Sequence, residues 1–410
     1  MAISHMPVRL SVRTQNEGAQ TPCSTVLPGL TPPVTPTVDD DSLSGSEVTV
    51  HSNSSSPLLS PVDANPEESI KDVSEPKQFT DNLEYQYDPK GRPVEFGRGV
   101  WSVVYKASSF PAVKSGLLTP PSSPAFKGRV VAVKSPVRRD AHSVLDAEAR
   151  ALTQISRVAG AEHHIVPFHG YISESHSIVM SAVPLALSTY IQDKAATAQK
   201  NRSTQTMFDP VSGMVQWRVL AEKLIAGLAW LHRGPQMVHG DIKPHNILLR
   251  LRSPGGQELD LDSDSFPYEP LFADFSSAHP IASPSSPEQC MGTALTALTP
   301  PFAAPELLCV SSLTSPDVAP TPESDVFSLA VSLLAAATGD LLLYPGASNL
   351  QRLAMAREGH RVIDFARSGP NGSRVPRAGV VEQIIKPAIA KDPSQRVYPA
   401  DWLHLAESVH

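Results

Sequence analysis

Aromatic residues begin late in this chain, and their absence from the first part limits where a core can form. No Phe, Tyr or Trp precedes Phe79 among the 410 residues, and the segment before it is rich in Ser, Thr and Pro. Such a segment buries too little apolar area to offset the entropy that it would lose on ordering. We therefore expect residues 1–78 to form a disordered tail and residues 79–410 to contain the folded part.

The tail also carries most of the net charge. Residues 1–80 contain four basic and ten acidic residues, and therefore −6 of the net charge of −7. The rest of the chain is nearly neutral, which gives no electrostatic reason to expect nucleic acid as a partner. The tail is a candidate contact for a regulatory partner. Its five Ser/Thr-Pro dipeptides are either sites for proline-directed kinases or chance pairs, and they begin at Thr21, Thr31, Thr35, Ser56 and Ser60.

The cysteines and the hydropathy pattern bear on the cellular setting. Three scattered cysteines, at positions 23, 290 and 309, are too few for a disulfide framework or a zinc site. No apolar run reaches the roughly 18 residues of a membrane span, so we expect no membrane contact. The weakly basic first fifteen residues lack the apolar core of a secretory signal, and a mitochondrial presequence stays open as the alternative. We expect a cytoplasmic and/or nuclear protein.

The hydrophobic periodicity changes from strand-like to helical along the folded part. Short β-type runs predict strands at Ser102–Lys106, Arg129–Lys134, Gly160–Tyr171 and Ser177–Val183. Helical periodicity follows at Val215–His232, Asp325–Thr338 and Val380–Ala390. Stretches of turn-forming residues predict surface loops at 115–127, 252–269 and 283–299. The pattern predicts an α+β fold with a small β-rich lobe followed by a larger helical lobe.

The stretch His239–Leu249 has the residue types of a phosphoryl-transfer loop. Asp241 and Asn246 lie five residues apart, with Lys243 between them, just before an apolar strand. An Asp can accept a hydroxyl proton, a Lys can neutralise a moving phosphate, and an Asn can bind a metal ion. The stretch resembles the catalytic loop of protein kinases, H-R-D-x-K-x-x-N, with Gly240 in place of the usual Arg.

A glycine-containing turn lies between two strand-like runs upstream of this loop. Its sequence, Gly97-Arg98-Gly99-Val100-Trp101-Ser102, departs from G-x-G-x-x-G at the last position. Glycines in such a turn let the backbone approach phosphates closely. The turn resembles the lid of kinases, which implies that Gly97 and Gly99 cover the phosphates of ATP. An ordinary β-hairpin is the alternative.

The run Val131–Lys134 resembles the V-A-I-K strand of the same family. The resemblance implies that Lys134 contacts the α- and β-phosphates and that Glu148, on a helix-like run 14 residues later, pairs with it. The sequence Ala-Val-Lys-Ser occurs twice, which makes Lys114 the alternative lysine. We favour Lys134 because its strand is fuller and its distance from Glu148 suits a strand-to-helix link.

The segment Ile178–Pro184 resembles the hinge that joins the two kinase lobes. Met180 would then occupy the gatekeeper position. Since any buried strand before a loop has a similar pattern, this placement depends on the order of the motifs. The resemblance implies that ATP also contacts Val104, Ala132, Ala182 and Leu248.

The motifs after the catalytic loop continue in the order of the family. Asp274-Phe275-Ser276 resembles the D-F-G motif, which implies that Asp274 and Asn246 bind Mg²⁺ and that Phe275 packs against the core. Thr299–Glu306 resembles the end of an activation segment, T-x-x-Y-x-A-P-E. In serine/threonine kinases this Thr contacts the catalytic Asp and Lys, so the resemblance favours Ser/Thr specificity.

Two further residues have counterparts in the family. Asp325, in Ser-Asp-Val-Phe-Ser-Leu, resembles the buried Asp that supports the catalytic loop. Arg396, in Lys-Asp-Pro-Ser-Gln-Arg, resembles the Arg that pairs with the Glu of A-P-E, here Glu306. Both belong to the structural frame of a protein kinase rather than to its nucleotide site.

Together, the motifs resemble a serine/threonine protein kinase over about residues 80–410. The resemblance implies a bilobal fold with an N-lobe at 79–183 and a C-lobe at 184–410, ATP and Mg²⁺ as cofactors, and a protein substrate. One alternative is a small-molecule phosphotransferase of the aminoglycoside or choline kinase type, which also has H-G-D-x-x-x-x-N. Another is a pseudokinase scaffold, which the presence of every charged residue expected at ATP or metal disfavours. Four residues favour a protein substrate: Lys243, Glu306, Asp325 and Arg396.

Gly240 bears on regulation. The Arg that it replaces usually binds the activation-loop phosphate and helps to order that loop. Without it, phosphorylation of Thr293 or Thr296 is expected to matter less for activity. Asp-Phe-Ser and the run Pro184–Ser188 also give a more distant resemblance to fungal kinases that activate cyclin-dependent kinases.

Overall fold

The computed structural model describes most of the part that we expect to fold. The described residues are 75–112, 128–201, 203–252, 266–281, 299–309, 318–346 and 348–409. The expected disordered tail lies outside them except for residues 75–78, and so do Lys114, Thr293 and Thr296. Contacts with the folded part begin slightly before residue 79, because Lys77 and Gln78 already pair with a strand of the sheet.

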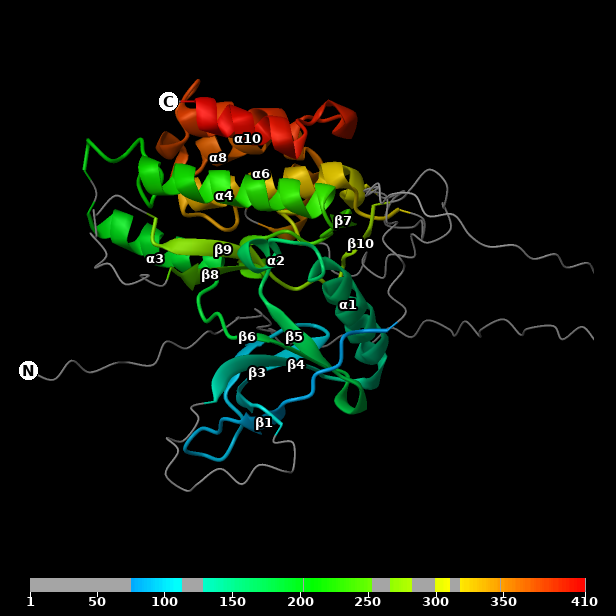
Figure 1. Cartoon of the computed structure of the whole chain (residues 1–410). Coiled ribbons are helices and arrows are strands. Elements are labelled where there is room, and N and C mark those ends of the chain that lie inside the picture. Colours follow the sequence, from blue (N-terminus) through cyan, green and yellow to red (C-terminus); the bar gives the residue numbers. More distant parts are fainter. Residues whose placement is uncertain are drawn as a thin grey trace, which may run out of the picture. The chain divides into compact units, whose positions relative to one another are not determined.

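An antiparallel sheet forms the first lobe (Figure 1). Its strand order is β1-β3-β4-β6-β5, with β2 paired to β3. The predicted strand at Gly160–Tyr171 is wrong in its first half, where the helical turn α2 stands instead. The strands are β1 (Asn82–Tyr85), β2 (Glu95–Arg98), β3 (Ser102–Phe110), β4 (Arg129–Pro136), β5 (Phe168–Ile172) and β6 (Ser177–Ser181).

The alternation along β4 separates the two faces of this sheet. Val131 and Val133 pack with Ala107 and Val179 in a small cluster on one face. Successive strand residues point to opposite faces, so Ala132 and Lys134 share the other face. The register pairs Val104 with Lys134 and Lys106 with Ala132, which places Val104 on that second face as well.

The second lobe is mainly helical (Figure 1). Two short antiparallel two-stranded sheets lie within it: β8 (Ile247–Leu251) pairs with β9 (Tyr268–Phe272), and β10 (His279–Pro280) pairs with β7 (Met237–Val238). None of the helices in the described part of the chain combines the length and apolarity needed to cross a membrane. The helices of both lobes are α1 (His142–Ile155), α2 (Ala161–His164), α3 (Leu187–Lys200), α4 (Met214–Arg233), α6 (Pro322–Thr338), α7 (Asn349–Arg357), α8 (Val362–Ser368), α9 (Val380–Ile385) and α10 (Pro399–Ser408).

Helix α6 forms the centre of this lobe. Every residue from Ser324 to Thr338 is buried, as expected of a helix that is apolar on all sides. Thr321 and Ser324 form a capping box at its start, and Gly339 ends it in the left-handed conformation. The helix therefore begins three residues before the predicted Asp325, because its cap precedes the apolar run.

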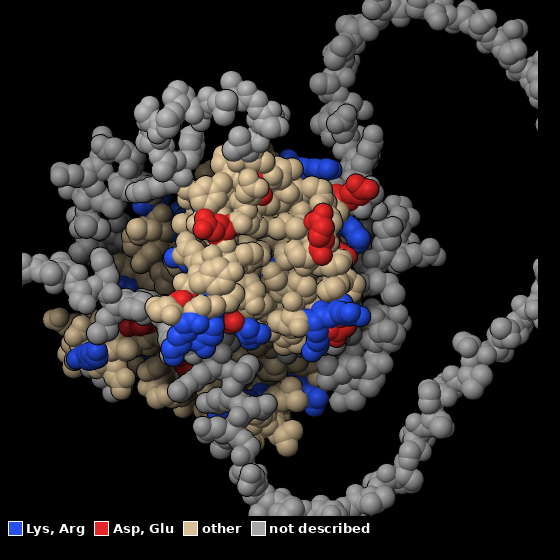
Figure 2. All heavy atoms as spheres, turned by 90° about the horizontal axis from the view of Figure 1, so that it is seen from below, with Lys and Arg blue, Asp and Glu red and all other residues tan. Residues whose placement is uncertain are grey.

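Figure 2 shows the face seen from below Figure 1, on the side of the small lobe. Uncharged residues cover most of the described surface there. Lys and Arg side chains lie in several separate groups, with Asp and Glu side chains among them. On this face, the described residues of both signs are therefore mixed.

Candidate active site

One buried carboxylate, that of Asp325, holds the catalytic loop between β7 and β8 in place. Asp325 of α6 accepts a hydrogen bond at Oδ2 from the backbone N–H of His239 (2.7 Å) and one at Oδ1 from that of Gly240 (2.9 Å). Burial alone would raise the pKa of Asp325, but hydrogen bonds from the His232 ring and the His239 amide lower it. The loop is therefore held by a charged group that the helix core surrounds.

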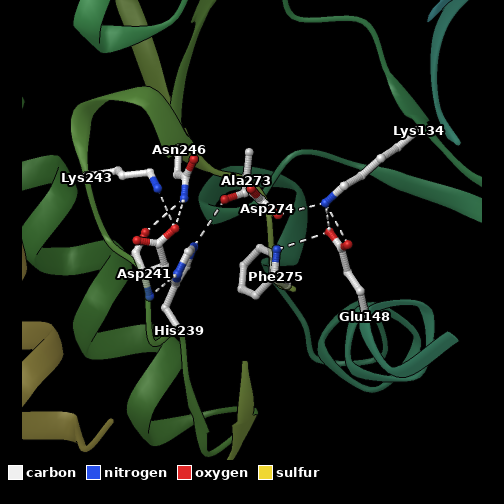
Figure 3. Close-up of polar contacts among 9 residues, drawn as sticks. All are labelled: Lys134, Glu148, His239, Asp241, Lys243, Asn246, Ala273, Asp274 and Phe275. Carbon is white, nitrogen blue, oxygen red and sulfur yellow. Dashed lines mark hydrogen bonds and ion pairs between the residues drawn. The ribbon is translucent and has the colours of Figure 1, made fainter. Parts of the chain in front are cut away.

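The His239 ring links the loop to the segment Ala273-Asp274-Phe275 (Figure 3). Its Nε2 donates to the carbonyl oxygen of Ala273 at 3.2 Å, and its Nδ1 accepts from the backbone N–H of Asp241 at 3.3 Å. Both bonds are satisfied by a neutral imidazole, and burial lowers the pKa of His239 accordingly. One buried ring thus sets the positions of Asp241 and of the residue before Asp274.

The side chains of the loop converge on Asp241 (Figure 3). Lys243 Nζ lies 2.6 Å from Asp241 Oδ2 and 3.1 Å from Thr299 Oγ1. Asn246 Nδ2 donates to the backbone oxygen of Asp241 (2.9 Å) and to its Oδ2 (3.0 Å). The predicted catalytic residues are therefore in mutual contact, and Thr299 contacts Lys243 from 56 positions further along the chain.

Burial raises the pKa of Asp241 to about 6. The ammonium of Lys243 opposes this rise, and the negative charge of Asp274 adds to it. A carboxyl group with a pKa near the working pH is well matched to accepting a proton, because it is largely ionised yet still basic. The geometry and the electrostatics both suit a residue that receives the proton of a substrate hydroxyl.

A second group of charges lies where the two lobes meet. Lys134 Nζ from β4 lies 2.7 Å from Glu148 Oε1 and 2.6 Å from its Oε2 on α1, and 2.7 Å from Asp274 Oδ1. Burial opposes the charge of Lys134, but the carboxylates of Asp274 and Glu148 outweigh it and raise the pKa. Lys134 is thus a buried cation held between the carboxylates of Glu148 and Asp274. Lys114, the alternative lysine, lies outside the described residues.

The segment Asp274-Phe275-Ser276 is bonded to the same group of charges. Glu148 Oε1 accepts a hydrogen bond from the backbone N–H of Phe275 at 3.1 Å, and the Phe275 ring is buried 4.7 Å from the centre of the His239 ring. Asp274 adopts a φ of +63°, a left-handed conformation that is uncommon for residues other than glycine. The strained residue is therefore held on both sides by buried contacts.

The residues expected around a nucleotide are distributed between the two lobes. Val104 and Ala132 lie on the inner face of the sheet, and Ala182 is half-buried directly after β6. Leu248 on β8 packs with Met180 and Val183 in one apolar cluster. The structure therefore places apolar side chains on either side of the lobe junction.

The glycine turn closes the hairpin of β2 and β3. The backbone N–H of Gly99 donates to the oxygen of Ser102 at 2.8 Å. A side chain at Gly97 would have no neighbour within 4 Å, and one at Gly99 would meet the Ser102 oxygen only at 3.8 Å. The packing of the turn therefore does not require glycine at either position.

Two features require glycine at position 240: its backbone conformation and the closeness of Ser277. Its φ is +80°, and a Cβ atom placed there would lie 2.6 Å from the backbone oxygen of Ser277. The missing Arg is thus not an isolated change, because the segment after Asp274-Phe275-Ser276 occupies the space that its side chain would need. No local sequence pattern predicts this contact between Gly240 and Ser277.

The end of the activation segment is anchored by a bidentate ion pair. Arg396 Nη1 and Nη2 each lie 2.7 Å from an oxygen of Glu306, and the guanidinium stands 5.1 Å from the centre of the Phe327 ring. The side chain of Arg396 is fully buried. The two residues that the motifs pair are therefore brought together from 90 positions apart.

Side-chain oxygen atoms of Asn246 and Asp274 suit a magnesium ion. Asn246 uses its amide nitrogen on Asp241, which leaves Oδ1 outside every hydrogen bond found among the described residues. Burial opposes the charge of Asp274, but the Lys134 ammonium holds its pKa well below the usual range, so the carboxylate is ionised. Amide and carboxylate oxygens are the ligands that Mg²⁺ prefers. When bound there, the ion would neutralise charge on the phosphates of ATP.

Sequence reasoning missed one partner in this frame. His232 at the end of α4 lies 3.1 Å from Asp325 Oδ2, although 93 positions separate the two residues. A single His at the end of an apolar helix carries no signal of a distant carboxylate. Its only sequence cue is the buried face of α4 on either side of it.

Comparison with known families agrees with this geometry. Residues 124–405 match the family model described as the protein kinase domain. Comparison with curated proteins gives no match. The family match begins after β3 and therefore leaves out the glycine turn with its two strands. These strands still belong to the same sheet, because β3 pairs with β4 over eight residues. Because the match covers most of the chain, and because Lys134, Asp241 and Asp274 stand in one site, this chain belongs to the protein kinase domain family.

Proposed function

We propose that this protein kinase transfers the γ-phosphate of ATP, as its magnesium complex, to Ser or Thr residues of protein substrates. The observation that carries the Ser/Thr assignment is the bridge formed by Lys243, whose Nζ contacts both Asp241 Oδ2 and Thr299 Oγ1. The bridge brings the end of the activation segment close to the carboxylate of Asp241. This closeness favours a substrate that presents a short aliphatic hydroxyl, that of Ser or Thr, to Asp241.

The other residues have roles that follow from their positions. Lys134, oriented by Glu148, would contact the phosphates of ATP under Gly97 and Gly99. Asn246 and Asp274 would hold the magnesium ion. Asp241 would orient the substrate hydroxyl and receive its proton, and Lys243 would stabilise charge on the transferred group. Positioning and charge stabilisation would supply most of the rate enhancement.

We further propose that activity does not depend on phosphorylation of the activation loop. Position 240 has no guanidinium to bind a loop phosphate, and the Ser277 oxygen lies where such a side chain would start. The catalytic loop is instead fixed through Asp325. Purified Thr293→Ala and Thr296→Ala variants should retain phosphotransfer, and loss of activity in both would refute this proposal.

The direct test is a phosphotransfer assay with the purified full chain. Three peptides that differ only in a Ser, Thr or Tyr acceptor should separate the hydroxyl classes, and excess chelator should stop the reaction. Asp241→Asn is the inactive control, while Lys114→Met and Lys134→Met identify the lysine that ATP requires. Equal rates on the Tyr peptide would overturn the Ser/Thr assignment. No transfer by the wild-type chain would favour a scaffold.

A further inference from the structure

A short segment before β1 extends the edge of the sheet. Gln78 pairs in parallel with Tyr171 of β5, the last strand in the sheet order. The backbone N–H of Tyr171 donates to the oxygen of Lys77 (2.8 Å), and that of Phe79 donates to the oxygen of Tyr171 (2.9 Å). We call residues 77–79 the strap, because they lie alongside β5 and contact helix α1 through Lys77.

The strap lies very close to β5. A Cβ atom at Gly170 would stand 2.7 Å from the backbone N and Cα of Phe79. Only a glycine at position 170 leaves space for this approach, because the colliding atoms belong to the backbone and cannot rotate away. The close packing of the strap on β5 therefore depends on the glycine at position 170.

The strap also reaches α1 through Thr153. The backbone N–H of Lys77 donates to Thr153 Oγ1 at 2.9 Å, and the same hydroxyl donates to the backbone oxygen of Ala149 at 2.7 Å. Thr153 is buried, and Ala149 directly follows Glu148 in the helix. One hydroxyl therefore connects the strap with the turn of α1 that carries Glu148.

A second link holds the other side of the same turn. The hydroxyl of Tyr171 donates to Asp146, and the His176 ring contacts Asp146 Oδ1 at 2.9 Å. Asp146 and Thr153 lie on either side of Glu148 along α1. Because the strap pairs with the backbone of Tyr171, both links depend on the same edge of the sheet.

We propose that Thr153 and the strap are positioning elements for catalysis, which hold α1 so that Glu148 stays on Lys134 and on the Phe275 amide. The inference rests on the proposed phosphotransfer function. It extends the catalytic unit to a segment before β1, which includes the last two residues of the expected tail. Displacement of the strap would loosen the Lys134–Glu148 pair without touching either residue.

Two matched pairs of full-length variants test this role. Lys77→Pro removes the N–H donor, whereas Lys77→Ala keeps it. Thr153→Val removes the hydroxyl, whereas Thr153→Ser keeps it. We expect Lys77→Pro and Thr153→Val to lower kcat/KM for ATP by about threefold to tenfold, and the two controls to stay within about twofold of wild type. Hydrogen exchange of the α1 amides should rise in the first two variants at a temperature where all four are folded.

A double-mutant cycle separates positioning from general destabilisation. In a Glu148→Gln background, Thr153→Val should cause little further loss, because its effect passes through Glu148. Wild-type kinetics and wild-type α1 exchange in both Lys77→Pro and Thr153→Val would overturn the inference, as would additive losses in the cycle. An inactive wild-type chain would instead count against the proposed function, and the exchange of α1 would still report on the strap.

Discussion

Replacing Asp241 by Asn is expected to stabilise the fold while it removes phosphotransfer. Burial raises the pKa of Asp241 to about 6 from its ordinary 3.8, although the Lys243 ammonium 2.6 Å away favours the carboxylate. The ionised side chain therefore destabilises the folded state at neutral pH. The difference between the two pKa values corresponds to about 3 kcal/mol at full ionisation. A neutral side chain of the same shape avoids this penalty.

The gain should depend on pH in a definite direction. Because the folded pKa lies above the unfolded one, the bound proton stabilises the fold below pH 3.8, and this contribution is lost as pH rises through about 6. Asp241→Asn should thus exceed wild type by about 3 kcal/mol at pH 8 and by about half of that at pH 5. Urea unfolding at both pH values measures this. The phosphotransfer rate should fall by about 10²-fold to 10⁴-fold.

Asp325 provides a control, because its pKa shift has the opposite sign to that of Asp241. Its folded pKa is lowered despite burial, so its contribution to stability is present above pH 3.8 and is lost as pH falls through the folded pKa. Asp325→Asn should therefore destabilise the fold at pH 8, because it weakens the bonds to the backbone of His239 and Gly240. The reasoning fails if Asp241→Asn is no more stable than wild type at pH 8, or if its advantage does not shrink at pH 5.

Other perturbations probe the frame of the site. Gly240→Ala should lower the free energy of unfolding by about 1–3 kcal/mol, measured by urea unfolding, and Gly240→Arg should lower it by at least as much. Both introduce a Cβ atom that collides with the Ser277 oxygen at a φ of +80°. Wild-type stability of Gly240→Arg would contradict this. Glu306→Ala should cost about 3 kcal/mol by leaving the buried Arg396 guanidinium without its carboxylate. The exposed pair of Arg98 with Glu95 is its control, and Arg98→Ala should change stability by less than about 0.5 kcal/mol.

The sequence predicts the elements of this fold where periodicity and end signals agree. Helix α4 lies within one residue of its predicted bounds, Val215–His232, because a long apolar stripe defines it. The predicted helix Val380–Ala390 ends as an α-helix at Ile385, because Pro387 has no N–H to continue it. The strand predicted at Gly160–Tyr171 fails over a short mixed run, where periodicity cannot separate a helical turn from a strand.

The charged centre was more predictable than its supports. Lys134, Asp241 and Asp274 stand in motifs whose order marks them, and the structure brings them to one junction. The contact of Gly240 with Ser277 and that of Lys77 with Thr153 join a backbone atom to a distant residue. Every residue type supplies a backbone oxygen, and every type except proline supplies an N–H, so local sequence carries little information about such contacts.

Two buried aspartates next to the same loop show how the site combines rigidity with reactivity. Asp325 accepts two backbone N–H bonds, which stabilise its charge and fix the loop at His239 and Gly240. Asp241 has Lys243 and Asn246 as partners, and these do not offset its burial. A carboxylate that was stabilised as fully as Asp325 would be too weak a base to receive a proton near neutral pH. The stability of the loop must therefore come from Asp325, so that Asp241 can remain a basic and energetically unfavourable ion.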